Sequence, residues 1–125
     1  MTTHAHSWLT TPVANKLTLT PYRTTSRAYW YGESMTDTTL EDGAGAAFKL
    51  EGLSQHLIIE WRRLPGRGFH AFMTANDDSG NSHRYELGSP KTLQGLARAV
   101  SAYWNKGTTR YTVSAPTSID MPGEF

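Results

Sequence analysis

Hydrophobic and polar residues alternate with a period of two along most of the middle of the chain, which is typical of β-strands with one buried face. Turn-forming residues divide the alternation into short runs, as in antiparallel sheets. The pattern predicts strands at residues 16–22, 27–33, 46–52, 56–63, 69–75 and 83–87. The run TRYTVSA, residues 109–115, is a candidate for one last strand.

Residues 89–107 follow the period of an α-helix instead. Their apolar residues recur at spacings of three and four: Leu93, Leu96, Ala97, Val100, Tyr103 and Trp104. Ser89 suits the N-cap, Pro90 the first turn, and Gly107 a left-handed residue after the helix end. The pattern predicts one long helix that packs an apolar stripe on the sheet.

The turn residues allow the register of residues 57–87 to be predicted. Pro65 and Gly66 suit a type II turn, but a two-residue hairpin of that type splays twisted strands, which favours a five-residue loop over residues 64–68. Arg63 is then expected opposite Phe69, and Trp61 opposite Ala71. In the next hairpin, Met73 is expected opposite Tyr85 and Ala71 opposite Leu87.

This register separates two faces of the sheet. One face collects the apolar residues Leu57, Ile59, Trp61, Phe69, Ala71, Met73, Tyr85 and Leu87, and we expect it to be the core. The other face collects Ile58, Glu60, Arg62, His70, Phe72, Thr74, Arg84 and Glu86, and it is mostly polar. Phe72 and Ile58 are the apolar exceptions there, and a neighbouring subunit is one candidate to cover them.

These elements predict an α+β fold, in which a curved antiparallel sheet of five or six strands packs on one long C-terminal helix. Residues 16–113 are expected to form a single domain. Residues 1–15 and 114–125 are rich in Thr, Ser, Pro and Gly without clear periodicity, and they are expected to be flexible tails.

The amino-acid composition excludes several classes of function. The chain has 125 residues, and 12 Lys and Arg against 11 Asp and Glu give a net charge of +1, which argues against a general polyanion binder. It has no cysteine, which excludes disulfides, thiolate metal sites and a cysteine nucleophile. We find neither a signal peptide nor an apolar run of about 20 residues that could span a membrane, and we expect a cytoplasmic protein.

The charges are nevertheless unevenly distributed. Residues 31–55 hold five acids, Glu33, Asp37, Glu41, Asp42 and Glu51, against one lysine. Residues 88–113 hold Lys91, Arg98, Lys106 and Arg110 and no acid. Residues 56–70 add three arginines around a Pro-Gly turn. The basic segments could contact phosphates, the acidic and basic segments could be halves of a protein interface, or the charges could serve solubility alone.

Two groups of residues are the candidate binding site. Arg62, Arg63, Arg67 and His70 are the predicted electrostatic contacts, and Arg67 stands between two glycines in PGRG, where it could make bidentate contacts to phosphate or carboxylate. Tyr29, Trp30, Tyr31 and Phe72 are the predicted aromatic anchors, since such residues are enriched in interface cores.

No motif indicates catalysis, a metal or a cofactor. His4 and His6 resemble a minimal pair of metal ligands, but zinc needs three or four placed ligands. Glu60 with His70 or Glu86 would form an acid–base pair, yet a flat sheet face offers no dry pocket. The glycines of residues 41–46 match no nucleotide-binding motif.

The sequence therefore predicts a non-enzymatic binding protein without a cofactor. We expect an accessory, immunity or inhibitor protein, which could be phage-encoded, that occupies a surface of a protein partner through the basic hairpin. That partner could belong to a complex that handles nucleic acid. Direct nucleic-acid binding through the hairpin and the basic helix is the alternative, and homo-oligomerisation is left open.

Overall fold

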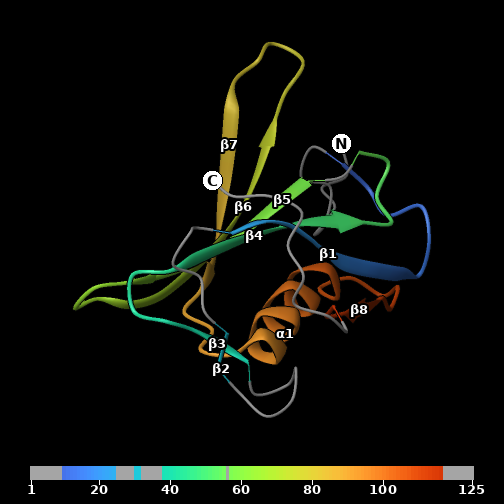
Figure 1. The fold of residues 1–125 in the computed structure, drawn as a ribbon. Helices are drawn as coiled ribbons and strands as arrows, with labels where there is room; N and C mark the ends of the chain where they lie inside the picture. The colour runs from blue at the N-terminus through green and yellow to red at the C-terminus, as the bar shows by residue number, and fades with distance from the viewer. Residues whose placement is uncertain (1–9, 25–29, 32–37, 56, 117–125) are drawn as a thin grey trace.

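The structure is a computed structural model that describes residues 10–24, 30–31, 38–55 and 57–116. It is an α+β fold with a six-stranded sheet and one helix (Figure 1). Along the sheet the strands are ordered β7 (Ser82–Gly88), β6 (Gly68–Asn76), β5 (Leu57–Leu64), β4 (Gly45–Glu51), β1 (Lys16–Thr24) and β8 (Thr112–Ser114). The helix α1 (Leu93–Trp104) follows β7. A separate pair is formed by β2 (Trp30–Tyr31) and β3 (Thr39–Leu40).

The sheet is mixed, because β8 runs parallel to β1, whereas all other neighbouring strands of the sheet are antiparallel. The expectation of a purely antiparallel sheet is therefore wrong at this edge. The pattern of residues 109–115 correctly predicts the last strand, but not its direction. A parallel partner needs a long connection rather than a tight turn, so it cannot be recognised from local turn residues.

Five of the six strands predicted in the alternating region are confirmed within about two residues of their ends, namely β1, β4, β5, β6 and β7. The predicted strand at residues 27–33 is described only at Trp30–Tyr31, where it pairs with β3 outside the main sheet. The remaining residues of that run lie outside the described part of the chain.

The helix is shorter than the sequence pattern predicts. It has 12 residues and is capped by Thr92, whose hydroxyl accepts a hydrogen bond from the Gly95 N–H at 3.0 Å, and Asn105 caps its end. The predicted Ser89 cap is therefore wrong. Proline disfavours helical backbone in the residue before it, and Ser89 precedes Pro90. The segment before the helix instead brings the Pro90 carbonyl within 2.8 Å of Trp61 Nε1, which donates a hydrogen bond to it.

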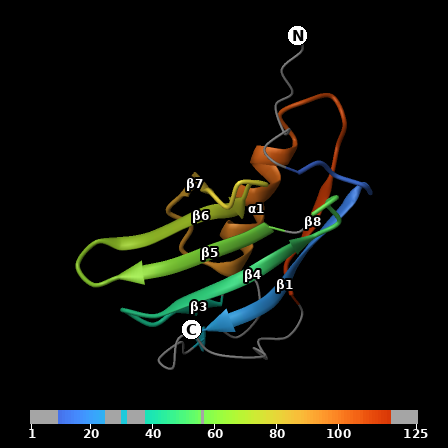
Figure 2. The ribbon, with the colours of Figure 1, turned by 90° about the horizontal axis from the view of Figure 1, so that it is seen from above.

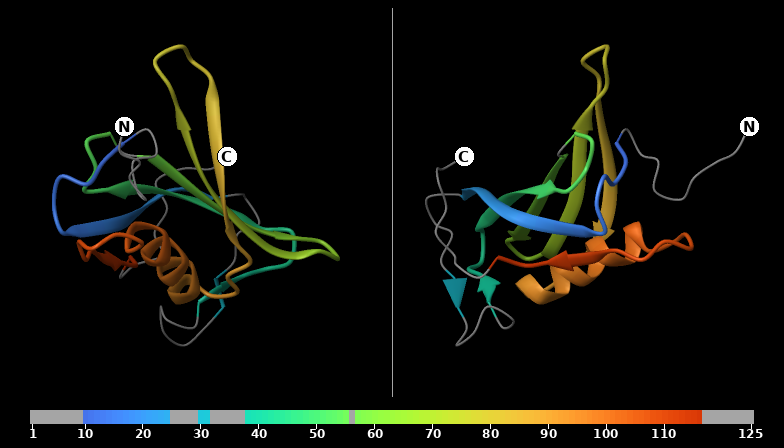
Figure 3. Two further views of the ribbon diagram at one scale, coloured as in Figure 1. Left: turned by 180° about the vertical axis from the view of Figure 1, so that it is seen from behind. Right: turned by 90° about the vertical axis from the view of Figure 1, so that its right-hand side faces the viewer.

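The core lies between α1 and one face of the sheet (Figures 2 and 3). All eight residues of the predicted core face belong to it or pack against it, and so do the six residues of the apolar stripe predicted for the helix. Trp61 from the sheet and Trp104 from the helix are completely buried. The two periodicities in the sequence therefore identify both surfaces of this core correctly.

The predicted register is confirmed in the β5–β6 hairpin, where Trp61 faces Ala71 and Arg63 faces Phe69. The pairing continues to Leu64 and Gly68, so the loop has three residues and the expected five-residue loop is wrong. In the next hairpin Met73 faces Tyr85 as expected, but a β-bulge places Gly88 rather than Leu87 opposite Ala71.

Residues 10–15 pack against the loop that follows β4. Val13 N–H bonds to the Gly52 carbonyl at 2.9 Å, and the Thr10 hydroxyl donates to the Gln55 carbonyl at 2.8 Å. Gly52 has a φ of 103°, and a Cβ there would lie 2.6 Å from the Lys16 carbonyl oxygen, so only glycine fits. Residues 1–9 and 117–125, most of the two expected tails, lie outside the described residues.

Candidate functional site

The candidate site begins at the turn between β5 and β6, which lies at the outer end of the two strands (Figure 2). Pro65 and Gly66 occupy the centre of this turn, and the Arg67 N–H closes it on the Leu64 carbonyl at 3.0 Å. Gly66 and Gly68 have φ angles of 70° and 83°, which favour glycine. The sequence PGRG therefore forms a tight tip that carries one arginine between two glycines.

The three predicted arginines have different surroundings. Arg62 Nη2 is 2.7 Å from Glu60 Oε1 on the outer face, which is the face of the sheet opposite α1. Arg63 donates from Nη1 to the Leu40 carbonyl at 2.9 Å, and its Nε is 3.9 Å from Asp42 Oδ1.

Arg67 is exposed at the tip, and its side chain makes no hydrogen bond or ion pair within the described residues. Of the three guanidinium groups, that of Arg67 therefore has the fewest contacts within the chain to break when it binds a partner.

His70 and Arg84 lie on the outer face of the sheet and share one acid. His70 Nε2 hydrogen-bonds to Glu86 Oε1, and Arg84 Nε donates to Glu86 Oε2 at 2.8 Å. The hydrogen bond from His70, followed by the contact with Arg84, holds the pKa of Glu86 below its usual 4.5. Phe72 faces Glu60 on one neighbouring strand and Glu86 on the other, so these three residues form one row across the sheet.

Phe72 is buried although it lies on the face without a helix. It is 5% exposed, the Arg84 guanidinium carbon lies 3.6 Å from the centre of its ring, and the His70 ring is 5.4 Å away. The expectation of an exposed Phe72 is therefore wrong in this structure. As an aromatic anchor, Phe72 would become accessible only if Arg84 moved.

The other predicted anchors belong to the segment around β2. The backbones of Trp30 and Tyr31 pair with Leu40 and Thr39. Tyr29 lies outside the described residues, as do the side-chain positions of Trp30 and Tyr31. The structure therefore places the strand of this group next to Leu40, whose carbonyl accepts from Arg63.

The acidic loop before β4 lies directly beside the basic hairpin. Gly43 N–H bonds to the Arg63 carbonyl at 2.8 Å, and Arg63 N–H bonds to the Ala44 carbonyl at 2.9 Å. Asp42 of this loop is thus held beside Arg63. The two segments of opposite charge, which are separate in the sequence, form one mixed surface in the structure.

The basic residues after β7 do not join that surface as a group. Lys91 lies just before α1, and its carbonyl accepts from the Thr39 hydroxyl of β3 at 2.5 Å. Lys106 and Arg110 lie beyond the far end of α1, which is about 18 Å long. Lys106 packs against Tyr85 and Tyr103 there, and Arg110 donates to the Asn105 carbonyl at 2.8 Å.

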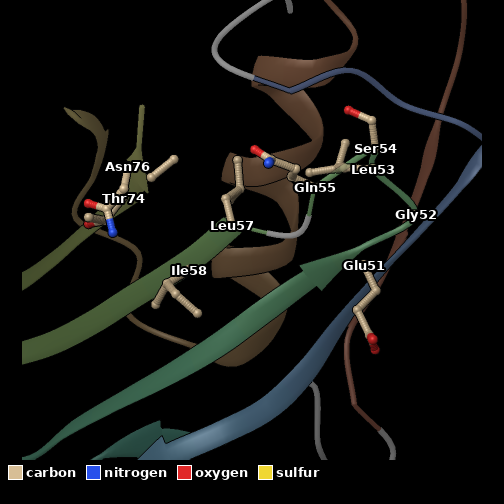
Figure 4. Close-up of a pocket in the computed structure, with 10 residues that line it drawn as sticks. Glu51, Gly52, Leu53, Ser54, Gln55, Leu57, Ile58, Thr74 and Asn76 are labelled. Carbon is tan, nitrogen blue, oxygen red and sulfur yellow. The ribbon is translucent and has the colours of Figure 1, made fainter. Parts of the chain in front are cut away.

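A groove of about 690 Å³, which the sequence did not indicate, opens where β6 extends past the beginning of β5 (Figure 4). Its lining includes Leu57 and Ile58. Polar side chains from the end of β4, from the loop after it and from β6 complete it: Glu51, Ser54, Gln55, Thr74 and Asn76. The Thr74 hydroxyl is buried without a hydrogen-bond partner among the described residues. No residue pattern in the sequence indicates this groove, since Gly52, which lines it, is required by the close approach to Lys16 and Leu17 of β1.

Groups that would indicate chemistry are scarce in the described ranges. No cluster of three or more His, Asp or Glu residues there could hold a metal ion, and His4 and His6 lie outside those ranges. His83 bonds to Asp77 at 2.9 Å and lowers the pKa of that carboxyl. Glu60, the candidate base, is the acceptor for Arg62.

The chain matches no protein family model, and neither the curated proteins nor the solved structures contain a significant match to it. Within the described residues, no helix combines the length and the apolar character needed to cross a bilayer.

Proposed function

We propose that this chain is a non-enzymatic binding protein that occupies a surface of a protein partner through the β5–β6 tip. The observation that carries the proposal is Arg67, a permanently charged group that is exposed at a tight turn and has no partner among the described residues. An accessory, immunity or inhibitor protein, including a phage-encoded one, would use such a surface.

The construction of the tip supports this role. Arg63 bonds through its backbone to the acidic loop on one side, and the Pro65–Gly66 turn is closed by a backbone hydrogen bond. A loop that is already ordered loses less conformational entropy on binding than a flexible one. The Arg67 guanidinium could therefore dock in a carboxylate-lined pocket with the backbone around it already in place.

The distribution of acids favours a protein partner over nucleic acid. Glu60 and Glu86 lie beside Arg62 and Arg84 on the outer face, and Asp42 lies beside Arg63. A phosphate backbone that followed this surface would meet a carboxylate next to each of these arginines, which opposes binding. A protein surface can place its own cations opposite these acids, so the mixed pattern becomes a source of specificity.

The test compares Arg67→Ala with Arg98→Ala, a variant of an exposed arginine on α1. Each chain is immobilised and exposed to an extract of the cells that produce it, and retained proteins are quantified by mass spectrometry. We expect a protein that is retained by the native chain and by Arg98→Ala but lost with Arg67→Ala. Equal retention by all three chains would contradict the proposal.

A fluorescence-anisotropy titration with single- and double-stranded DNA and RNA at two salt concentrations tests the alternative. We expect no binding in the micromolar range. Micromolar affinity that falls steeply with salt and is lost in Arg67→Ala would instead establish direct nucleic-acid binding.

A further inference from the structure

Strand β7 forms one edge of the six-stranded sheet, and no strand of the described chain pairs with its outer side. It has seven residues, whereas β8 at the opposite edge has three. An open edge of this length presents a row of backbone N–H and C=O groups that can pair with another strand. We infer that a second copy of this chain pairs with β7, antiparallel and about a two-fold axis at Tyr85.

The geometry of an antiparallel ladder limits the possible registers. In an antiparallel pair, two residues that lie opposite each other have their side chains on the same face of the sheet. When two copies of one strand pair about a two-fold axis, this condition holds only if one residue, the central one, lies opposite the same residue of the other copy. The ladder between β7 and β6 is regular from Ser82 to Glu86, with the bulge after it. The central residue of the dimer is therefore expected within this regular part or at its end.

Charge then selects one of these registers. An axis at Arg84 would place two arginines opposite each other, and an axis at Glu86 would do the same with two glutamates. An axis at Ser82 or His83 would place Arg84 opposite Gly80 or Ser82, so Arg84 would have no acid opposite it. An axis at Tyr85 places Arg84 of each copy opposite Glu86 of the other, twice in one dimer. Because directly opposed like charges destabilise a sheet and opposite charges stabilise it, the Tyr85 register is preferred.

The inner side of the same edge offers apolar surface for the second copy to cover. A shallow groove of about 200 Å³ lies between β7 and α1, lined by Leu87, Ala99, Ala102 and Tyr103 together with Tyr85, Glu86 and Lys106. The Tyr85 and Tyr103 rings are 4.7 Å apart beside it, and Lys106 Nζ donates to the Tyr85 hydroxyl at 2.8 Å. Pairing at Tyr85 would bring the second copy alongside this groove.

The dimer would join two sheets into one continuous twelve-stranded sheet, with both α1 helices on the same face. It would leave the β5–β6 tips outside the new contact, because the second copy pairs with the side of β7 that faces away from β6. Two copies of the Arg67 tip would then belong to one particle. This inference does not depend on the proposed function, since it uses a different edge of the sheet.

The first experiment measures the mass of the full-length chain by sedimentation equilibrium over a range of concentrations. We expect a reversible dimer of two 13.9 kDa chains. Glu86→Arg, which places arginine opposite Arg84 twice, is expected to raise the dissociation constant at least about tenfold. The swapped variant that combines Arg84→Glu with Glu86→Arg restores opposite charges, and we expect it to dimerise again.

A crosslinking experiment tests the register itself, because the chain has no cysteine of its own. Directly opposed residues have Cα separations that suit a disulfide. A mixture of Arg84→Cys and Glu86→Cys chains is therefore expected to form the mixed disulfide on mild oxidation, in preference to either homodimer.

A native chain that stays monomeric would overturn the inference. So would a dimer whose affinity is unaffected by Glu86→Arg, or one in which the charge swap fails to restore association although circular dichroism shows a folded chain. A mixture that forms the two disulfide homodimers as readily as the mixed disulfide would overturn the register. Retention of a partner through Arg67 is measured separately, so either proposal can fail alone.

Discussion

Met73 and Phe72 are neighbours on β6 and both are buried, but they lie on opposite faces of the sheet. Met73 belongs to the core under α1. Phe72 has no helix over it and is covered by the side chains of Arg84 and His70. A sheet with a single helix can thus protect an apolar residue on its second face with the long side chains of charged neighbours, whose charged ends stay in water.

The largest effect is expected from the helix-covered face. Trp61→Ala would remove a completely buried ring and its hydrogen bond to Pro90, and we expect it to lower the free energy of unfolding by about 3 to 5 kcal/mol. Urea denaturation followed by tryptophan fluorescence and circular dichroism measures this loss. A loss smaller than that of Phe72→Ala would reverse the comparison between the two faces.

Phe72→Ala should cost less, about 2 kcal/mol, because the flexible side chains above it can collapse into the space that the ring leaves. The same denaturation experiment applies, with Phe72→Leu as the matched control that keeps most of the apolar volume. A cost below about 0.5 kcal/mol would show that Phe72 is in effect a surface residue.

Arg84→Ala removes the cover rather than the buried ring. Loss of the cation–π contact and of the apolar stem is expected to lower stability by about 1 kcal/mol. Arg98→Ala, which removes an exposed arginine on α1, is the control and should have almost no effect. If the two variants lose the same stability, Arg84 does not protect Phe72.

The pH dependence of the outer face is expected to be smaller still. Because His70 and Arg84 lower the folded-state pKa of Glu86, its ionised form adds stability above the unfolded pKa, near 4.5, and this contribution is lost as the pH falls through the lower folded value. The stability difference between the native chain and Glu86→Gln should therefore shrink between pH 6 and pH 3. Exposure of this acid keeps the effect below about 1 kcal/mol. A difference that grows on acidification would contradict the assignment.

Arg67 is neither buried nor a cover for anything, so Arg67→Ala should change stability by less than about 0.5 kcal/mol. The same variant is expected to abolish retention of the protein partner. Thermal denaturation beside the retention experiment separates the two effects. A large loss of stability would show that the tip has a structural role instead.

The alternation of residues 57–87 was enough to predict which side chains enter the core, because burial of one face imposes the period directly on the sequence. Leu87 shows the limit of that signal. It packs against the core as predicted, yet a bulge moves Gly88 opposite Ala71, and nothing in the hydrophobic pattern reports an extra residue in one strand.

The features that sequence reasoning missed depend on residues distant along the chain. The burial of Phe72 requires Arg84 from the next strand. The engagement of Arg63 requires Leu40 at the end of β3 and Asp42 in the loop after it, more than twenty residues earlier. The PGRG motif already distinguishes Arg67 in the sequence, but only the tertiary contacts show that Arg62 and Arg63 are engaged within the chain. The helix start was missed for a local reason, since Ser89 and Thr92 are both good caps.

The parallel pairing of β1 with β8 has a consequence for folding of the chain during its synthesis on the ribosome. Lys16 lies opposite Thr112, so one side of β1 stays unpaired until residues 112–114 have been synthesised. β1 can pair with β4 much earlier, but its other side has no strand partner before β8 is made. A nascent chain stalled within α1 would therefore present this strand to chaperones, or to other unfinished copies.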